Sequence, residues 1–566
     1  MAYSTMKQIV ALSLAAAACM AGGSDFHGRA MPLERIWAEN AKGDESAKTW
    51  RAVAWRNERV HGAFAVWGGD TNAEIRAEAE PLAGPGGATI PVRVRWVRET
   101  LASRFHFDAP RGKWDPAKYP LFPVGDVLDD AQPFFLTDRG FRGIWVSAKV
   151  PADASPGTYA GTLHVASGGE ELAFPLSLEV LRATLPQRKR MYLDIWQTPW
   201  TIARYYGVTP FTPEHYARLE PIYRELADAG QRAITVTITD YPWNVRENID
   251  TVRSMVKYVK RRDGSFVADF TLLDSYVAFA KKCGLGPQIH CYALVKFQRH
   301  DDYWYDDEAT GKPTCVHCKP GSEEFKAYWA PLLRQLESHV ADMGWKDDVY
   351  IALDELPRDD TAAAAALIRE CAPSFKFQMA GNINPSHFKG VVIDNYSQGM
   401  HKPSFFTPEF LAEVAARRAA GLTTTVYVCC EPPRPNCLVL SPLVEQRWIG
   451  LFMAAKGLDG FLKSTSHRWT PAVDPLVDSS CLPSFPCGDS FLLYPGPRSS
   501  VRWESLRDGF EDFEKVAELR ATGRLTPELE AALGNIDYTR FSGCDEAAVR
   551  IDVAAALSAI DAAARN

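Results

Sequence analysis

The spacing of apolar residues changes along the chain. From about residue 30 to residue 185, short apolar runs alternate with turn residues such as Pro151–Gly157, whose proline and glycine favour a tight connection. The runs are Ala63–Trp67, Ile90–Trp96, Gly143–Val150, Thr158–Ala166 and Leu172–Leu181. Short strands at this spacing predict an N-terminal β-sandwich domain over residues 30–185.

A different pattern begins near residue 186, where strand-like runs alternate with helix-like runs. The expected strands are Met191–Ile195, Ala233–Thr239, Gly286–Leu294, Val349–Leu353, Lys376–Ala380, Gly390–Asp394, Thr423–Cys429 and Gly460–Lys463. The expected helices are Pro213–Ala229, Leu272–Lys282, Glu323–Met343, Thr361–Cys371, Pro408–Ala420 and Pro442–Ala455. About eight such units over roughly 300 residues predict a parallel (β/α)8 TIM-like barrel over residues 186–502. A C-terminal helical segment over residues 503–566 completes a multidomain α/β protein.

The first residues have the pattern of an export signal. Lys7 precedes the apolar stretch Ile9–Met20 and small residues follow, so residues 1–23 are expected to be a secretory signal peptide. Ala16-Ala-Ala-Cys19 also resembles a bacterial lipoprotein box, which leaves a lipid anchor at Cys19 as an alternative. No later apolar run is long enough for a transmembrane segment. We therefore expect an exported protein, in the periplasm, at the cell surface or secreted.

The amino-acid composition limits the classes of ligand and cofactor that we expect the protein to bind. The 566 residues carry a net charge of −7 and no long Lys/Arg run, which argues against nucleic acid. Apart from Cys19, the other cysteines lie in the mature chain, where Cys315 with Cys318 and Cys481 with Cys487 are short-range disulfide candidates. Cys315-Val-His-Cys318 lacks the second ligand pair of a zinc site. Neither a metal nor another cofactor is expected.

Two adjacent carboxylates end one predicted strand. Residues 349–357 read Val-Tyr-Ile-Ala-Leu-Asp-Glu-Leu-Pro, so an apolar run delivers Asp354 and Glu355 into a loop stopped by Pro357. Asp and Glu are rarely buried unless they are paired or functional. Side chains alternate along a strand, so these two can share a pocket only where the chain leaves its regular pleat. The alternative is that Asp354 caps a following helix while Glu355 is solvated.

Polar and aromatic residues recur where the other predicted strands end. Because the carboxyl ends of parallel strands meet at one face of a barrel, we expect these side chains to form one site. Aromatic faces stack on sugar rings and carboxylates bind hydroxyls, so the group favours a carbohydrate ligand. The predicted sugar-binding residues are Asp194, Trp196, Tyr241, Trp243, Tyr292, Asp394, Tyr396, Tyr427, His467 and Trp469.

An adjacent pair of carboxylates limits the chemistry. Glycosidases that use two carboxyl groups place them on opposite sides of the bond, farther apart than neighbouring residues usually reach. A sugar with a 2-acetamido group supplies its own carbonyl oxygen as the nucleophile, and then the enzyme needs only an acid and a carboxylate that orients the amide. We assign Glu355 as the general acid and then base, and Asp354 as the orienting carboxylate.

Several motifs resemble glycoside hydrolase family 123 and its DUF4091 relatives. They are Asp194–Trp200, Tyr350–Glu355, Pro435-Asn436, Leu458–Leu462 and Gly488–Pro495, with Trp50–Arg59 and Pro151–Gly161 similar to the family's N-terminal β domain. The resemblance implies an exo-acting β-N-acetylgalactosaminidase that retains configuration, acts through Asp354 and Glu355, and binds sugar also through Asn436. Lys463–Trp469 departs from the aromatic-rich segment usual in the family, so an acidic or differently configured amino sugar stays open as the substrate.

Two other interpretations fit the same residues. One is a non-catalytic or altered-specificity glycan-binding surface protein on the same fold, motivated by the departure at residues 464–468. The other pairs Glu355 with Asp240 or Asp394 across the site. Asp489 and Arg502 are expected to form a buried pair that fixes the final loop. The sequence predicts neither the oligomeric state nor the natural glycan.

Overall fold

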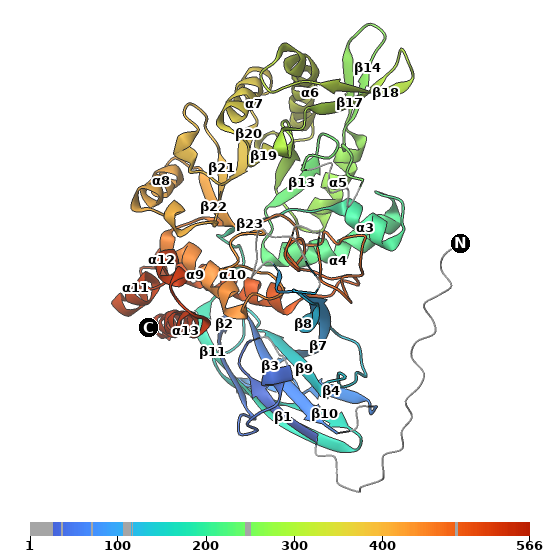
Figure 1. Ribbon diagram of the computed structural model, residues 1–566. Helices are drawn as coiled ribbons and strands as arrows, with labels where there is room; N and C mark the ends of the chain where they lie inside the picture. Colours follow the sequence, from blue (N-terminus) through green and yellow to red (C-terminus); the bar gives the residue numbers. More distant parts are fainter. Residues whose placement is uncertain are drawn as a thin grey trace, which may run out of the picture.

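The structure, a computed structural model, consists of two connected bodies. Figure 1 shows N-terminal sheets below and a barrel surrounded by helices above. The signal peptide predicted over residues 1–23 and the lipidation site at Cys19 lie outside the described residues. No helix in the described part combines the length and the apolarity that a membrane span needs. The described residues are 26–34, 38–69, 72–105, 115, 117–243, 251–481 and 485–565.

Two sheets with a shared core form the N-terminal region, as the sequence predicted for a sheet-rich domain. Phe64 and Ile144 of one sheet pack in the same buried cluster as Tyr159 and Phe174 of the other. The first sheet has the order β1 (Phe26–Met31), β3 (Arg59–Gly68), β9 (Phe141–Lys149), β7 (Val92–Ala102) and β8 (Phe122–Asp129). The second has β2 (Trp50–Arg56), β11 (Glu170–Thr184), β10 (Gly157–Ser167), β5 (Leu82–Ala83) and β6 (Thr89–Ile90), with β4 (Ile75–Ala79) beside β10. The short helix α1 (Ala38–Ala41) lies between β1 and β2 in the chain.

Eight parallel strands form a nearly closed barrel. In spatial order they are β12 (Tyr192–Ile195), β23 (Gly460–Lys463), β22 (Thr423–Tyr427), β21 (Asn395–Gly399), β20 (Lys376–Gly381), β19 (Val349–Asp354), β16 (Gln288–Tyr292) and β13 (Ala233–Thr237). A parallel bridge between Leu193 and Gln231 joins β12 to the β13 end of this order. At that seam, the amide groups of Gln231 and Gln197 hydrogen-bond to the backbone of Ile195 and Thr235. Side chains therefore satisfy backbone groups that the strand ladder leaves open.

Helices follow the barrel strands and cover the outside of the barrel (Figure 1). Thr212, Ser322 and Ser500 each accept a hydrogen bond from the backbone N–H three residues later and so start α4, α6 and α10. Gly230 ends α4 with a φ of +96°, a conformation that favours glycine. The helices are α3 (Pro199–Tyr206), α4 (Pro213–Ala229), α5 (Thr271–Lys282), α6 (Glu323–Asp342), α7 (Arg358–Cys371), α8 (Pro408–Ala419), α9 (Leu443–Lys456), α10 (Val501–Ala521), α11 (Pro527–Gly534), α12 (Tyr538–Ser542) and α13 (Glu546–Arg565).

One barrel strand lies five residues later than the sequence predicted. The expected strand was 390–394, whereas β21 comprises Asn395–Gly399. The apolar run misled the prediction because Val392 is 63% exposed, while the mostly polar residues of β21 are all buried. Asp394 therefore precedes the strand instead of ending it. Its carboxylate accepts a hydrogen bond from the Phe377 N–H at 2.8 Å, near the start of β20 and far from the strands' carboxyl ends.

The sequence did not predict a four-stranded sheet inserted into the barrel. It consists of β15 (Phe266–Asp269), β14 (Lys257–Lys260), β17 (Asp302–Asp307) and β18 (Lys312–His317), in that spatial order. Tyr328 of α6 donates its hydroxyl to the Trp304 carbonyl at 2.8 Å, and Tyr258 donates to the Tyr328 carbonyl at 2.8 Å. These bonds hold the inserted sheet on α6, at the top of Figure 1.

Helix α10 connects the barrel to the N-terminal sheets through buried ion pairs. Arg502 lies 2.9 Å from Asp126 of β8, and both side chains are completely buried. Glu504 lies 2.6 Å from Arg95 of β7. The predicted pair of Asp489 with Arg502 is wrong, since Asp489 binds Lys463 instead. The partner of Arg502 comes from a different domain, and no local pattern indicates it.

We expect Arg502→Met to lower the free energy of unfolding by about 3–5 kcal/mol, because the buried Asp126 charge loses its partner. Chemical denaturation at neutral pH measures the difference. Arg93→Met is the matched control, since Arg93 pairs with Asp130 where both side chains are more than half exposed. The control should change stability by less than about 1 kcal/mol. Equal effects of the two substitutions would contradict a structural role for the buried pair.

Candidate active site

The carboxylates of Asp354 and Glu355 line one cavity at the carboxyl end of β19. Asp354 is the last residue of the strand, and Glu355 has a left-handed backbone with a φ of +47°. Neighbouring side chains on a regular strand point to opposite faces, so the change at Glu355 is what lets both reach the cavity. The Glu355 N–H donates to the Ala380 carbonyl at 2.9 Å and extends the pairing of β19 with β20. Helix α7 starts after Pro357, so neither carboxylate caps it.

The cavity has a volume of about 310 Å³, at the lower end of the range for small-molecule sites. Six of the predicted residues line it: Asp354, Glu355, Trp196, Tyr241, Trp243 and Tyr427. The ring centres of Trp196 and Trp243 lie 5.2 Å apart, and each lies 4.9 Å from the ring of Tyr292. Tyr292 is completely buried, donates its hydroxyl to Gln378 at 3.2 Å, and packs against both tryptophans without lining the cavity.

The two carboxylates have different surroundings. Burial, and next the charge of Glu355, raise the pKa of Asp354 well above its ordinary value. Burial also raises the pKa of Glu355, but interactions with His401 and Tyr427 outweigh it and bring the pKa below the ordinary value. The Tyr427 hydroxyl donates to Glu355 Oε1 at 2.5 Å, and His401 Nε2 lies 3.8 Å from the same oxygen. The two pKa values are therefore shifted in opposite directions, which favours the protonated form of Asp354 and the ionised form of Glu355.

His401 is a site residue that the sequence analysis missed. It is the second residue after β21, at the carboxyl end of the barrel, and its Nε2 also lies 3.4 Å from the Tyr427 hydroxyl. Burial lowers the pKa of His401, but the interaction with Glu355 outweighs it and leaves the pKa raised. The misplaced strand explains the omission, because a strand ending at Asp394 directs attention to residues 394–396. A correct strand end would have indicated His401.

Asp394 and Tyr396 consequently do not line the cavity. Asp394 is bound near the start of β20, as described above. Tyr396 is completely buried in the barrel wall, where its hydroxyl donates to the Ile383 carbonyl. The structure places neither residue at the cavity for the same reason, the five-residue displacement of the strand.

Asp194 and Asn436 do not line the cavity either. Asp194 is 1% exposed, and its Oδ2 lies 3.0 Å from His290 Nδ1 inside the barrel. The Asn436 amide donates to the backbone carbonyls of Cys429 and Pro432 at 2.8 and 2.6 Å. Asp194 is thus an interior barrel residue, and Asn436 holds the loop after β22 in place.

The segment after β23 places Arg468 at the cavity, and not the predicted His467 and Trp469. His467 and Trp469 are both completely buried, and Trp469 donates its indole N–H to the Leu493 carbonyl at 2.9 Å. Burial lowers the pKa of His467 to about 3, so this ring is neutral. Arg468, between them, lines the cavity together with Ser464. The segment was correctly chosen, but side chains that alternate along it put the predicted residues on the inner side.

The structure also bears on the roles that the sequence suggested for Asp240 and for the cysteines. Asp240 does not line this cavity; its carboxylate binds Arg253 at 2.8 Å, so it is not positioned to act with Glu355. The described cysteines are all free thiols, which overturns both disulfide candidates. The sulfurs of Cys481 and Cys487 accept separate hydrogen bonds, from the Ser490 hydroxyl and the Ser103 N–H. No cluster of three or more His, Cys, Asp or Glu in the described residues is arranged to hold a metal.

A parallel barrel with two carboxylates and several aromatic rings around one cavity at its carboxyl-end face has the architecture of a glycoside hydrolase. The catalytic-domain model of glycoside hydrolase family 123 matches residues 196–519, and the family's N-terminal-domain model matches residues 37–167. The chain belongs to glycoside hydrolase family 123.

Comparison with solved structures agrees with this assignment. A family 123 glycoside hydrolase from Clostridium perfringens, studied for glycolipid glycan hydrolysis, has a TM-score of 0.83 at 24% identity over 95% of this chain and 98% of that chain. An endo-β-1,4-mannanase from Thermotoga petrophila has a TM-score of only 0.33 at 10% identity, over 58% of this chain and 77% of that chain. No curated protein sequence matches the chain. The first similarity shows the fold, and the second is too low to inform function.

The raised pKa of Asp354 predicts a dependence of stability on pH. Because folding raises this pKa above the ordinary 3.8, stability is lost as the pH rises from about 4 through the raised pKa. Asparagine cannot ionise, so Asp354→Asn should be more stable than the wild type at pH 7, by about 0.5–2 kcal/mol, and the difference should shrink at pH 4. Urea denaturation at the two pH values measures it.

Asp359→Asn is the matched control, because Asp359 is exposed in the first turn of α7. An exposed carboxylate near a helix N-terminus is favourable, so this substitution should give no gain in stability at either pH. A gain for Asp354→Asn that is the same at pH 4 and pH 7 would show that the carboxylate is not destabilised by ionisation.

Proposed function

We propose that the protein is an exported exo-acting β-N-acetylhexosaminidase that releases terminal β-linked N-acetylgalactosamine with retention of configuration. The observation that carries the proposal is the position of Asp354 and Glu355, side by side in a cavity of about 310 Å³ whose surroundings shift their pKa values in opposite directions. A cavity of this size suits a single sugar ring, which is what an exo-acting enzyme binds. The signal-like N-terminus predicted from the sequence supports export.

The nucleophile is assigned to the substrate because the described lining of the cavity holds no third carboxylate free to do this work. Among the described residues that line it, the remaining carboxylate is Asp489, and this group lies 2.5 Å from the buried Lys463. Asp354 and Glu355 come from the same strand end and reach the sugar from the same side. Two-carboxylate mechanisms need groups on both sides of the bond. The 2-acetamido carbonyl oxygen of the sugar fills the missing position.

The opposite pKa shifts of the two carboxyl groups suit this chemistry. When the amide N–H of the substrate donates to Asp354, it favours the ionised form of that carboxylate, and the proton passes to Glu355. The acetamido oxygen then attacks the anomeric carbon, the glycosidic C–O bond breaks, and Glu355 protonates the leaving oxygen. Asp354 stabilises the oxazolinium-like intermediate. Glu355 next deprotonates a water that attacks the anomeric carbon, which restores the acetamido group and the original configuration.

The choice of sugar rests on the family and on the cavity wall. Membership of family 123 supports N-acetylgalactosamine, and the Clostridium perfringens relative supports a glycolipid glycan as its source. Arg468 lines the cavity where the chain departs from the family's usual aromatic-rich segment. An acidic or differently configured amino sugar, which the departure of this segment leaves open, is the alternative substrate.

Nitrophenyl β-glycosides of N-acetylgalactosamine, N-acetylglucosamine and galactose test the proposal. We expect the first to have the highest kcat/KM and the galactoside, which lacks the acetamido group, to be inert. Glu355→Gln should lower kcat by about 10²–10⁴-fold, the usual contribution of a general acid, while Asp359→Asn should leave it unchanged. Efficient cleavage of the galactoside would refute acetamido participation. Glycan binding without activity in the wild type would favour the non-catalytic alternative.

Tyr427→Phe should shift the acid limb of the pH profile. The Tyr427 hydroxyl lowers the pKa of Glu355, so its removal raises that pKa. The acid limb marks the uptake of a second proton by the pair, and we expect it to move to higher pH in a plot of kcat/KM. Tyr396→Phe is the control, because this buried tyrosine on β21 donates to a backbone carbonyl. An acid limb that does not move in Tyr427→Phe would separate Tyr427 from the ionisation of the pair.

A further inference from the structure

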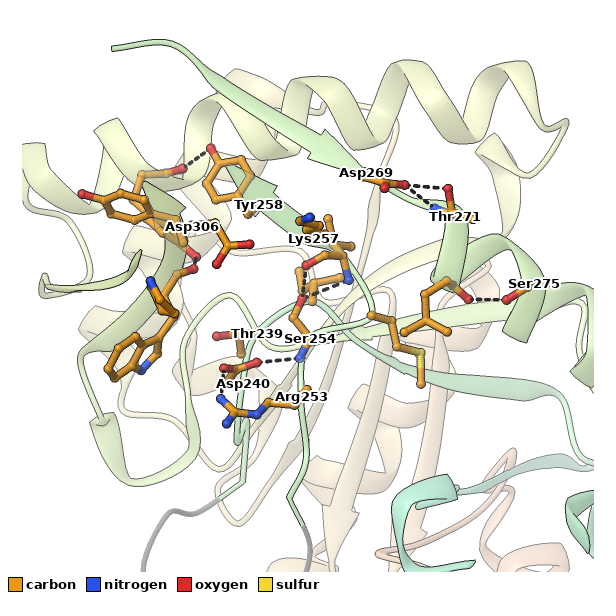
Figure 2. A pocket seen from close by; sticks show the side chains of 18 residues that line it. Thr239, Asp240, Arg253, Ser254, Lys257, Tyr258, Asp269, Thr271, Ser275 and Asp306 are labelled. Atoms are coloured by element: carbon orange, nitrogen blue, oxygen red, sulfur yellow. Dashed lines mark hydrogen bonds and ion pairs between the residues drawn. The ribbon is translucent and has the colours of Figure 1, made fainter. Parts of the chain in front are cut away.

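A second cavity lies beside the candidate active site. It has a volume of about 660 Å³ and opens between the loop after β13, the inserted sheet and helix α5. Figure 2 shows Asp240 and Arg253 on one side, Tyr258 and Asp306 on the inserted sheet, and Thr271 at the start of α5. The cavity is at least as large as the first, so it has room for a sugar ring.

The two cavities share a wall. Asp240 lines the second cavity and Tyr241, the next residue, lines the first. In the same way Val252 lines the first cavity and Arg253 lines the second. The Arg253 guanidinium lies over the Tyr241 ring, 5.6 Å from its centre. Adjacent residues of the chain thus line the two cavities, so a glycan that extends from the first would lie close to the second.

The second cavity contains an aromatic platform of the kind that binds sugars. Trp304 of β17 is 43% exposed although it is a large apolar side chain. Asp306 lies two residues further along the strand, on the same face, and is also exposed. The hydrogen bond from Tyr328 to the Trp304 carbonyl anchors the strand to α6. An anchored indole beside a carboxylate offers stacking for a sugar ring and an acceptor for its hydroxyls.

The charges of the lining select a neutral ligand. Asp240 and Arg253 neutralise each other at 2.8 Å, and Asp240 also accepts the Ser254 N–H at 2.7 Å. The remaining charged side chains of the lining are Lys257, Asp269 and Asp306, which leaves a net negative charge. A phosphate or nucleic-acid ligand would be repelled, whereas an uncharged polyhydroxylated chain would find both donors and acceptors.

We propose that this second cavity binds the sugars that follow the cleaved residue, so that the enzyme recognises an oligosaccharide and not only its terminal sugar. The inference rests on the proposed function, since it places the rest of the same substrate beyond the catalytic cavity. Trp304 stacks on one of these sugars, and Asp306 and Lys257 bind hydroxyls. The inserted sheet is then a specificity element that adds binding surface to the barrel.

Two substrates separate this role from a purely structural one. The first is the nitrophenyl β-glycoside of N-acetylgalactosamine, and the second is an oligosaccharide of at least three neutral sugars with the same terminal residue. We expect Trp304→Ala to lower kcat/KM for the oligosaccharide about tenfold, mainly through KM, and to change that for the nitrophenyl glycoside less than twofold. Asp306→Asn should act in the same direction with a smaller effect.

Phe135→Ala is the matched control, because Phe135 is an aromatic side chain with 45% exposure in the N-terminal region. It should affect neither substrate. Equal losses on both substrates in Trp304→Ala, or no loss on either, would overturn the inference while leaving the proposed function intact. Failure of the wild type to cleave the nitrophenyl glycoside would instead count against the proposed function.

Direct binding gives a second readout that does not need turnover. Calorimetric titration of the oligosaccharide into Glu355→Gln, and into the same variant carrying Trp304→Ala, should show about tenfold weaker binding in the double variant. Equal affinities would overturn the inference whether or not the wild type is active.

Discussion

The left-handed backbone of Glu355 is the constraint on which the site depends. On a regular strand Asp354 and Glu355 would point to opposite faces, one into the barrel and one away from it. A φ of +47° costs a non-glycine residue about 1–2 kcal/mol, so the surrounding structure must hold it. The Glu355 N–H bonds to Ala380, and its carboxylate accepts the Tyr427 hydroxyl. Three barrel strands, β19 with its neighbour β20 and the more distant β22, therefore fix the position of one carboxylate.

The close approach of the two carboxyl groups also affects which of them ionises more easily. Burial and the neighbouring charge oppose ionisation of Asp354, whereas Tyr427 and His401 favour the ionised form of Glu355. Opposite pKa shifts favour a protonated carboxyl group beside an ionised one, the combination that acid–base chemistry uses. The raised pKa of Asp354 lowers the stability of the folded protein, because this carboxyl group ionises more easily in the unfolded chain, where water surrounds it. The site is thus assembled at the expense of local stability, as is common where chemistry takes place.

The N-terminal sheets contribute to the site from a distance. Arg502, bound to Asp126 of β8, donates to the carbonyls of Gly488 and Phe491. These two residues flank Asp489 and Ser490, which line the cavity. Separating a completely buried ion pair strongly destabilises the fold, because each charge would then lack both its partner and water. The pair therefore fixes the relative position of the two domains and, through the same guanidinium, one wall of the cavity.

By itself the sequence determined the sheet-rich N-terminal region, the alternation that makes the barrel, and the carboxylate pair at the end of β19. These are local patterns, set by the period of apolar residues and by residues adjacent in the chain. Only the tertiary structure decided the true position of β21, the presence of His401 beside Glu355, the choice of Arg468 over His467 and Trp469, and the pairing of Arg502 with Asp126. Each depends on which distant segments pack together, and polar residues buried by such packing, like those of β21, carry no local apolar signal.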